Sequence, residues 1–237
     1  MIPLYDRNPT RHFPIVTVGL IVACFVVFGL ELTISMGSGD AALDAFFLQW
    51  GAVPSKITAA IDAGKWFSPA MLGILTSMFL HGGWLHILGN MLYLWIFGNN
   101  VEDRLGRIPF LLFYVVGGTV AALAQVVIDP TSSNPLVGAS GAIAAALGAY
   151  IVLFPGARIL SLVFLGFFYQ LLEVPALVIL GFWFVLQLIS GFASLGGQTA
   201  EGGVAFFAHI GGFALGLVVG FLIRLGGGAR SSPAPMG

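Results

Sequence analysis

Six long apolar stretches constrain this 237-residue sequence more than any other feature. A helix needs about 20 apolar residues to cross a bilayer, and each stretch reaches or approaches that length. Because lipid satisfies no backbone polar group, such stretches are expected to span as helices that close their own hydrogen bonds. The sequence therefore predicts an all-α polytopic membrane protein with six transmembrane helices in a compact bundle. The predicted spans cover residues 14–35, 76–97, 108–128, 140–154, 175–192 and 204–225.

Composition agrees with a membrane protein and excludes several function classes. The chain is 58% hydrophobic and 8% charged, whereas a soluble domain carries about 25% charged residues. A net charge of −1 offers no basic surface for nucleic acid. The single cysteine, Cys24, lies in an apolar run, so neither a disulfide framework nor a cysteine-based zinc site is expected. We expect the lipid bilayer as a partner, with no nucleic acid, metal ion or cofactor.

The spans divide the chain into three parts. Residues 1–13 form an N-terminal segment, residues 14–225 the membrane domain, and residues 226–237 a tail predicted to be disordered. A long loop between the first two spans is predicted to be partly helical. The apolar residues 160–172 are predicted to be interfacial or an extension of the fifth span, from which Glu173 and Pro175 separate them.

Basic residues predict the orientation. With six spans both termini lie on one side, and the side richer in Lys and Arg is cytoplasmic. That side collects seven arginines, against two lysines in the long loop on the other side, so both termini are predicted to be cytoplasmic. The seven are Arg7, Arg11, Arg104, Arg107, Arg158, Arg224 and Arg230, and the two are Lys56 and Lys65.

Four polar side chains lie deep inside the predicted spans. Polar groups at such depth are expensive and are functional candidates by default. At about 1.5 Å of rise per residue, Ser140 and His209 lie about 22 Å from the cytoplasmic boundary, and His86 about 24 Å. Asn90 lies one helical turn below His86. The similar depths predict one shared polar site.

The fourth span begins at the serine. From Ser140 to Pro155 it is too short to cross, so the preceding loop must dip into the membrane, where irregular backbone needs protein or water around it. Gly138 and Gly141 allow tight turning and close approach beside the serine. Free N–H groups at a helix N-terminus would favour a developing negative charge there.

Rows of small residues predict how Ser140 and His209 could meet. Small residues four apart let transmembrane helices approach closely, and His209 follows the start of one row. The rows are Ser140, Ala144 and Gly148 in the fourth span, and Ala208, Gly212, Gly216 and Gly220 in the sixth.

The inventory of deep groups favours a Ser–His dyad. His86 and Asn90 are four residues apart, share a helix face and can both donate hydrogen bonds to an oxyanion. We expect no Asp or Glu at this depth, because outer acids such as Glu31 are predicted to lie at helix ends or in loops. A Ser-His-Asp triad is therefore not expected.

Four motifs in order resemble those of the rhomboid intramembrane serine proteases. They are HGGWLHILGN (His81–Asn90), VEDRLG with Glu102, Arg104 and Gly106, VGASGA with Gly138, Ser140 and Gly141, and AHIGGFALG with His209, Gly212 and Gly216. The resemblance covers nearly the whole chain.

The resemblance implies specific roles. Ser140 would be the nucleophile, His209 the general base, and His86, Asn90 and the Ser140 N–H the oxyanion hole. The implied activity is hydrolysis of peptide bonds in or near the transmembrane segments of membrane proteins. The six-span form is similar to prokaryotic members, which implies a prokaryotic plasma membrane.

The chain departs from the family pattern at two places. Leu72-Gly73 stands where many members carry Trp-Arg. Ala144 stands where some members carry an aromatic residue that packs on the catalytic histidine, so some other group must orient His209.

Other interpretations of the same residues stay open. His86, Asn90 and His209 could form the polar pathway of a small transporter or channel, which needs no nucleophile at Ser140. A non-catalytic rhomboid-like protein that binds membrane clients is a further alternative. Among the remaining motif residues, His81 is predicted to make a structural hydrogen bond, and Glu102 and Arg104 an interfacial ion pair.

Overall fold

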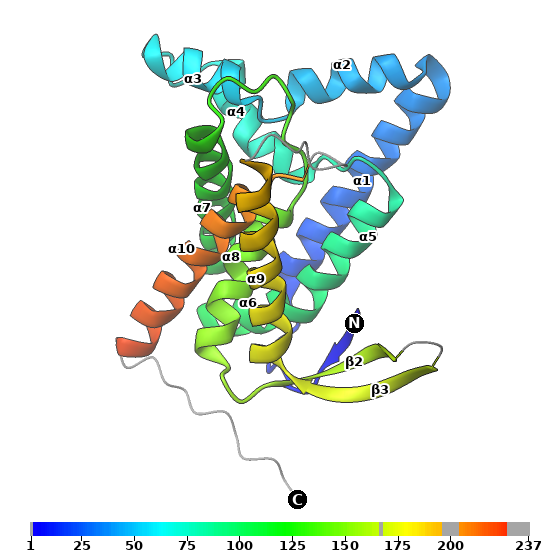
Figure 1. Cartoon of the computed structure of the whole chain (residues 1–237), viewed down its shortest axis with the longest axis vertical. Coiled ribbons are helices and arrows are strands. Elements are labelled where there is room, and N and C mark those ends of the chain that lie inside the picture. The colour runs from blue at the N-terminus through cyan, green and yellow to red at the C-terminus, as the bar shows by residue number, and fades with distance from the viewer. Residues whose placement is uncertain (1, 166–167, 196–203, 227–237) are drawn as a thin grey trace, which may run out of the picture.

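The computed structural model describes residues 2–165, 168–195 and 204–226. A bundle of helices carries helices α2 to α4 at one end, the loop end, and a three-stranded sheet at the other, the sheet end (Figure 1). The elements are β1 (Ile2–Asp6), α1 (Ile15–Ser38), α2 (Asp40–Trp50), α3 (Pro54–Asp62), α4 (Pro69–Thr76), the 3₁₀ turn η1 (Ser77–Phe79), α5 (Trp84–Tyr93), the π-helical turn η2 (Leu94–Gly98), α6 (Asn99–Leu105), α7 (Arg107–Ile128), α8 (Ser140–Leu153), β2 (Arg158–Leu165), β3 (Phe168–Pro175), α9 (Ala176–Ser194) and α10 (Phe206–Leu225).

The helices confirm a multi-pass membrane protein. Within the described residues, α1, α7, α9 and α10 are each long and apolar enough to cross a bilayer. A bent pair, residues 69–79 and 84–105 at 79° to each other, supplies a fifth candidate span. Helix α8 has 14 residues and begins at Ser140, as the sequence predicted. The count of six spans stays a prediction.

The second span differs from the predicted continuous helix over residues 76–97. The chain breaks after η1, and α5 begins only at Trp84. Gly83, at φ +150°, gives the break a backbone conformation that side chains disfavour. The His81 N–H donates to both carboxylate oxygens of Glu31, at 3.1 and 3.3 Å, instead of a helical carbonyl. Glu31 was predicted at a helix end, but it lies within α1 and is 2% exposed.

The described part of residues 160–172, namely 160–165 and 168–172, forms strands and does not extend the fifth span, so that alternative is wrong, whereas the interfacial location stays a prediction. The strands are β2 and β3, which pair antiparallel, and β1 from the N-terminus pairs antiparallel with β2. Pro175 explains why α9 starts at Ala176: proline offers no N–H and disfavours helical geometry in the residue before it. The tail predicted to be disordered lies, from residue 227 onward, outside the described residues.

Glu102 forms hydrogen bonds with the start of α1. It does not pair with Arg104, so the predicted ion pair between Glu102 and Arg104 is wrong. The Glu102 carboxylate accepts hydrogen bonds from the N–H groups of Val16 and Thr17, at 3.0 and 2.7 Å, and from the Thr17 hydroxyl at 2.8 Å. The first N–H groups of a helix lack intrahelical partners and favour negative charge. Glu102 therefore joins α6 to the N-terminus of α1.

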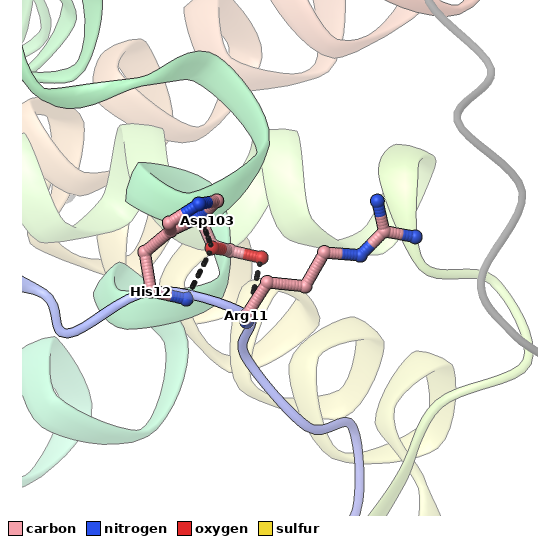
Figure 2. Close-up of polar contacts among 3 residues, drawn as sticks. All are labelled: Arg11, His12 and Asp103. Carbon is pink, nitrogen blue, oxygen red and sulfur yellow. Dashed lines mark hydrogen bonds and ion pairs between the residues drawn. The ribbon is translucent and has the colours of Figure 1, made fainter.

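Asp103 fixes the chain just before α1. Figure 2 shows its carboxylate facing Arg11 and His12. The two backbone N–H groups donate to it at 3.1 and 3.0 Å, and the His12 ring lies 2.9 Å away. The acidic pair at 102 and 103 thus orders the whole entry into the first span.

Helix α8 forms the centre of the bundle and packs backbone to backbone against α10. Residues 142–150 of α8 are all buried. A methyl group at Gly216 would collide with the Ala145 carbonyl oxygen, and one at Gly212 with that of Gly141. The small-residue row of α10 therefore packs against α8 as predicted, but it meets Gly141 and Ala145 instead of Ser140 and Ala144.

Candidate active site

The serine stands at the first turn of α8. The preceding loop is fastened to η1, because the Gly138 N–H donates to the Ser77 carbonyl at 2.9 Å. Gly138 has φ +124°, and a Cβ there would lie 2.7 Å from His86 Nε2. Glycine is thus required both for the turn and for the close approach of α5, so the loop that leads to Ser140 packs against His86.

Close packing of α8 and α10 brings Ser140 and His209 together. His209 Nε2 lies 2.8 Å from Ser140 Oγ, a hydrogen-bond distance, although 69 positions separate the residues. The contact depends on Gly212, one turn after His209, because a side chain there would push α10 away from α8. This is the geometry of a nucleophile and its general base.

The other ring nitrogen of His209 contacts an amide. Nδ1 lies 2.8 Å from Gln187 Oε1 on α9. The Trp183 ring lies beside His209, with centroids 5.7 Å apart. Trp183 thus gives His209 the aromatic neighbour that the alanine at position 144 does not provide. Sequence reasoning missed Gln187, but a signal existed: it is an amide within an apolar span, to which the same default of function applies.

Ser140 and His209 open into a cavity of about 620 Å³ between α5, α8, α9 and α10. His86 and Asn90 line the same cavity, so the four predicted deep residues surround one space. The Gly82 N–H donates to His86 Nδ1 at 3.3 Å, which leaves His86 Nε2 to carry the proton of a neutral ring. Asn90 Nδ2 is buried and has no partner among the described residues. His86 Nε2–H and Asn90 Nδ2–H are therefore two hydrogen-bond donors at the cavity with no acceptor among the described residues.

His81 lies behind this site. It is buried, its Nδ1 lies 3.1 Å from the Phe79 carbonyl oxygen, and its ring packs edge-on against His86 at 5.2 Å. These contacts agree with a structural hydrogen bond and support the ring of His86.

Residues 68–226 match the family model described as the rhomboid domain. The chain belongs to the rhomboid family. The match includes every residue of the site, from His81 to Gly216.

Several curated rhomboid proteins are similar over part of this chain. "Rhomboid protease GluP" of Bacillus subtilis is 37% identical over 41% of this chain and 18% of its own length. "Rhomboid protein 1, mitochondrial" of Saccharomyces cerevisiae is 33% identical over 42% of this chain and 30% of its own length. "Rhomboid protease GlpG" of Yersinia pestis is 27% identical over 56% and 41%. The chain thus matches less than half the length of each relative.

Proposed function

We propose that this rhomboid protein is an intramembrane serine endopeptidase that works through a dyad of Ser140 and His209. The observation that carries the proposal is the 2.8 Å contact between His209 Nε2 and Ser140 Oγ, at a cavity with unused hydrogen-bond donors. Membership of a family with several members named as proteases supports it.

The geometry supports a two-step acyl transfer. His209 Nε2 takes the Ser140 proton as Oγ attacks the carbonyl carbon of the scissile bond. The Ser140 N–H, His86 Nε2–H and Asn90 Nδ2–H donate to the resulting oxyanion. The protonated His209 returns the proton to the leaving amine, which leaves an acyl-serine. A water then attacks this ester with the same base, and Ser140 is regenerated as the carboxylic acid departs.

The proposed substrates are membrane proteins with a single transmembrane helix. A helix shields its own peptide bonds, so a site near a helix-weakening stretch and a small residue is the preferred target.

The proposed location is a prokaryotic plasma membrane with both termini in the cytoplasm. Reporter fusions at Gly237 and near Asp44 should then report opposite sides, and reports from one side would overturn this orientation.

Cleavage in proteoliposomes tests the function. Wild-type protein is expected to cut a fluorogenic peptide with one transmembrane segment, whereas Ser140→Ala should not. Ser190→Ala is the matched control, because Ser190 lies on α9 and does not line the cavity, and it should cut normally. Absence of cleavage combined with client binding or ion flux that Ser140→Ala leaves intact would favour the binding or transport alternatives.

A further inference from the structure

Gln187 contacts His209 from the side opposite the serine. Within the described residues, the two ring nitrogens of His209 contact Ser140 and Gln187, each at 2.8 Å. Gln187 does not line the cavity, whereas Trp183, one turn earlier on α9, does. Gln187 therefore reaches the histidine from behind and has no place for direct contact with a substrate in the cavity.

The orientation of the Gln187 amide determines which histidine nitrogen carries the proton. Gln187 Nε2 donates to the Trp183 carbonyl at 3.4 Å, so Oε1 is the atom turned toward His209. An amide oxygen only accepts, and His209 Nδ1 must then be the donor. A neutral imidazole with its proton on Nδ1 has a lone pair on Nε2, the nitrogen beside Ser140 Oγ.

We propose that Gln187 is a positioning residue that holds His209 in the tautomer and orientation required of the general base, a Ser-His-Gln arrangement in which a neutral amide stands where a triad has a carboxylate. This inference rests on the proposed protease function. The amide selects the tautomer and aligns the ring, but it carries no charge with which to stabilise the imidazolium. It also accounts for the orientation of His209 in a chain with alanine at position 144.

Few charges act on His209 within the described residues, so a new one should have a clear effect. Helix α9 has no ionisable side chain, α8 has only Tyr150, α7 has Arg107 and Tyr114, and α10 has Arg224 beyond His209. From α5, His86 and Tyr93 are the titratable side chains that line the same cavity as His209.

Two substitutions at Gln187 test the proposal through the peptide-cleavage assay. Gln187→Leu removes the acceptor that orients the base and should lower kcat at least about 10-fold, a part of the about 10²- to 10⁴-fold that a general base contributes, with KM unchanged. Gln187→Glu keeps an acceptor and adds a charge that favours the imidazolium. The acid limb of kcat/KM should therefore move to higher pH by about one unit or more.

Gln125→Leu is the matched control. Gln125 also gives α10 an amide contact, since its Oε1 accepts the Phe207 N–H at 3.2 Å, but it does not touch His209. This variant should keep the wild-type acid limb. The ¹⁵N spectrum of labelled wild-type protein should show His209 protonated at Nδ1, and Gln187→Leu should show a mixture of tautomers.

The outcomes separate this inference from the proposed function. If the wild type does not cleave, the protease assignment fails. If it cleaves but Gln187→Glu keeps the wild-type acid limb, or His209 carries its proton on Nε2, the positioning role is wrong and the dyad stands. Should Gln187→Leu not fold, the Gln187→Glu profile and the wild-type spectrum decide alone.

Discussion

A polar cluster lies at each end of α8, and the two clusters differ in whether all their hydrogen-bonding groups have partners. Toward the sheet end, Asp6 of β1 is buried and accepts three hydrogen bonds: from the Tyr150 hydroxyl at 2.6 Å, from Asn100 Nδ2 at 2.7 Å and from the Asn8 N–H at 2.8 Å. At the N-terminus of α8, Ser140 and His209 are paired, but Asn90 Nδ2 has no partner among the described residues.

This difference in hydrogen bonding indicates that the Asp6 cluster stabilises the fold and that the Ser140 end binds a ligand. Buried polar groups are normally all hydrogen-bonded, and a fully paired network fixes one conformation. The Asp6 cluster fits that description, because it fastens the N-terminal strand to α8 and α6. Donors left unpaired beside a cavity indicate that the missing acceptor belongs to a ligand. We therefore expect substitutions at the Ser140 end to change catalysis and those at the Asp6 end to change stability.

Asparagines 90 and 100 allow the sharpest test of this comparison, with the largest effect. Asn90→Ala should lower kcat about 10²- to 10³-fold, the typical loss for one oxyanion donor, without lowering the melting temperature. Asn100→Ala should lower the melting temperature and leave kcat near wild type. Peptide-cleavage kinetics and thermal unfolding in detergent measure both. The opposite assignment of the two effects would break the comparison.

The packing that joins α8 to α10 should be nearly as sensitive. Gly216→Val places side-chain atoms against the Ala145 carbonyl and must displace α10. A misplacement of about 1 Å can lower a rate about 100-fold. Gly181→Val on α9 is the control, because nothing lies within 4 Å of a Cβ there. Equal cleavage rates in the two folded variants would show that close packing does not set the dyad.

Tyr150→Phe should affect stability alone. It removes one of the three hydrogen bonds that buried Asp6 accepts, and a typical hydrogen bond contributes about 0.5–1.5 kcal/mol to stability. The variant should unfold at a lower temperature, with kcat unchanged below its transition. A change in kcat without loss of stability would connect the two clusters and contradict their separation.

The smallest expected effect is a pH dependence at the sheet end. Burial raises the pKa of Asp6 from 3.8 to about 6, against the opposing effect of its hydrogen bonds with Tyr150 and Asn8. Between these values the folded protein holds a proton that the unfolded chain has released. The contribution of Asp6 to stability therefore falls as pH rises from about 4 to 6. Asp6→Asn should remove this part of the slope in melting temperature, and an unchanged slope would refute the raised pKa.

The sequence predicted which deep polar residues lie around one cavity better than it predicted the surrounding backbone. The length of the fourth span predicted a helix beginning at Ser140, and the rows of small residues predicted close packing of α10. Both features depend on local composition. The break before Trp84 depends on the distant Glu31, and the antiparallel strands β2 and β3 depend on pairing with each other and with the N-terminal strand. The role of Gln187 was not predicted, because a single amide forms no sequence motif and its partner, His209, is 22 positions away in the chain.

Fluorophosphonate labelling tests the central claim, that His209 activates Ser140, most directly. Attack by Ser140 Oγ on phosphorus expels fluoride, and the adduct can be located by mass spectrometry. Wild type and the control His12→Ala should be labelled at Ser140, Ser140→Ala should not be labelled, and His209→Ala should react at least about 100-fold more slowly, as expected when nucleophile and base act as a unit. Labelling of another serine, or undiminished labelling of His209→Ala, would contradict the account.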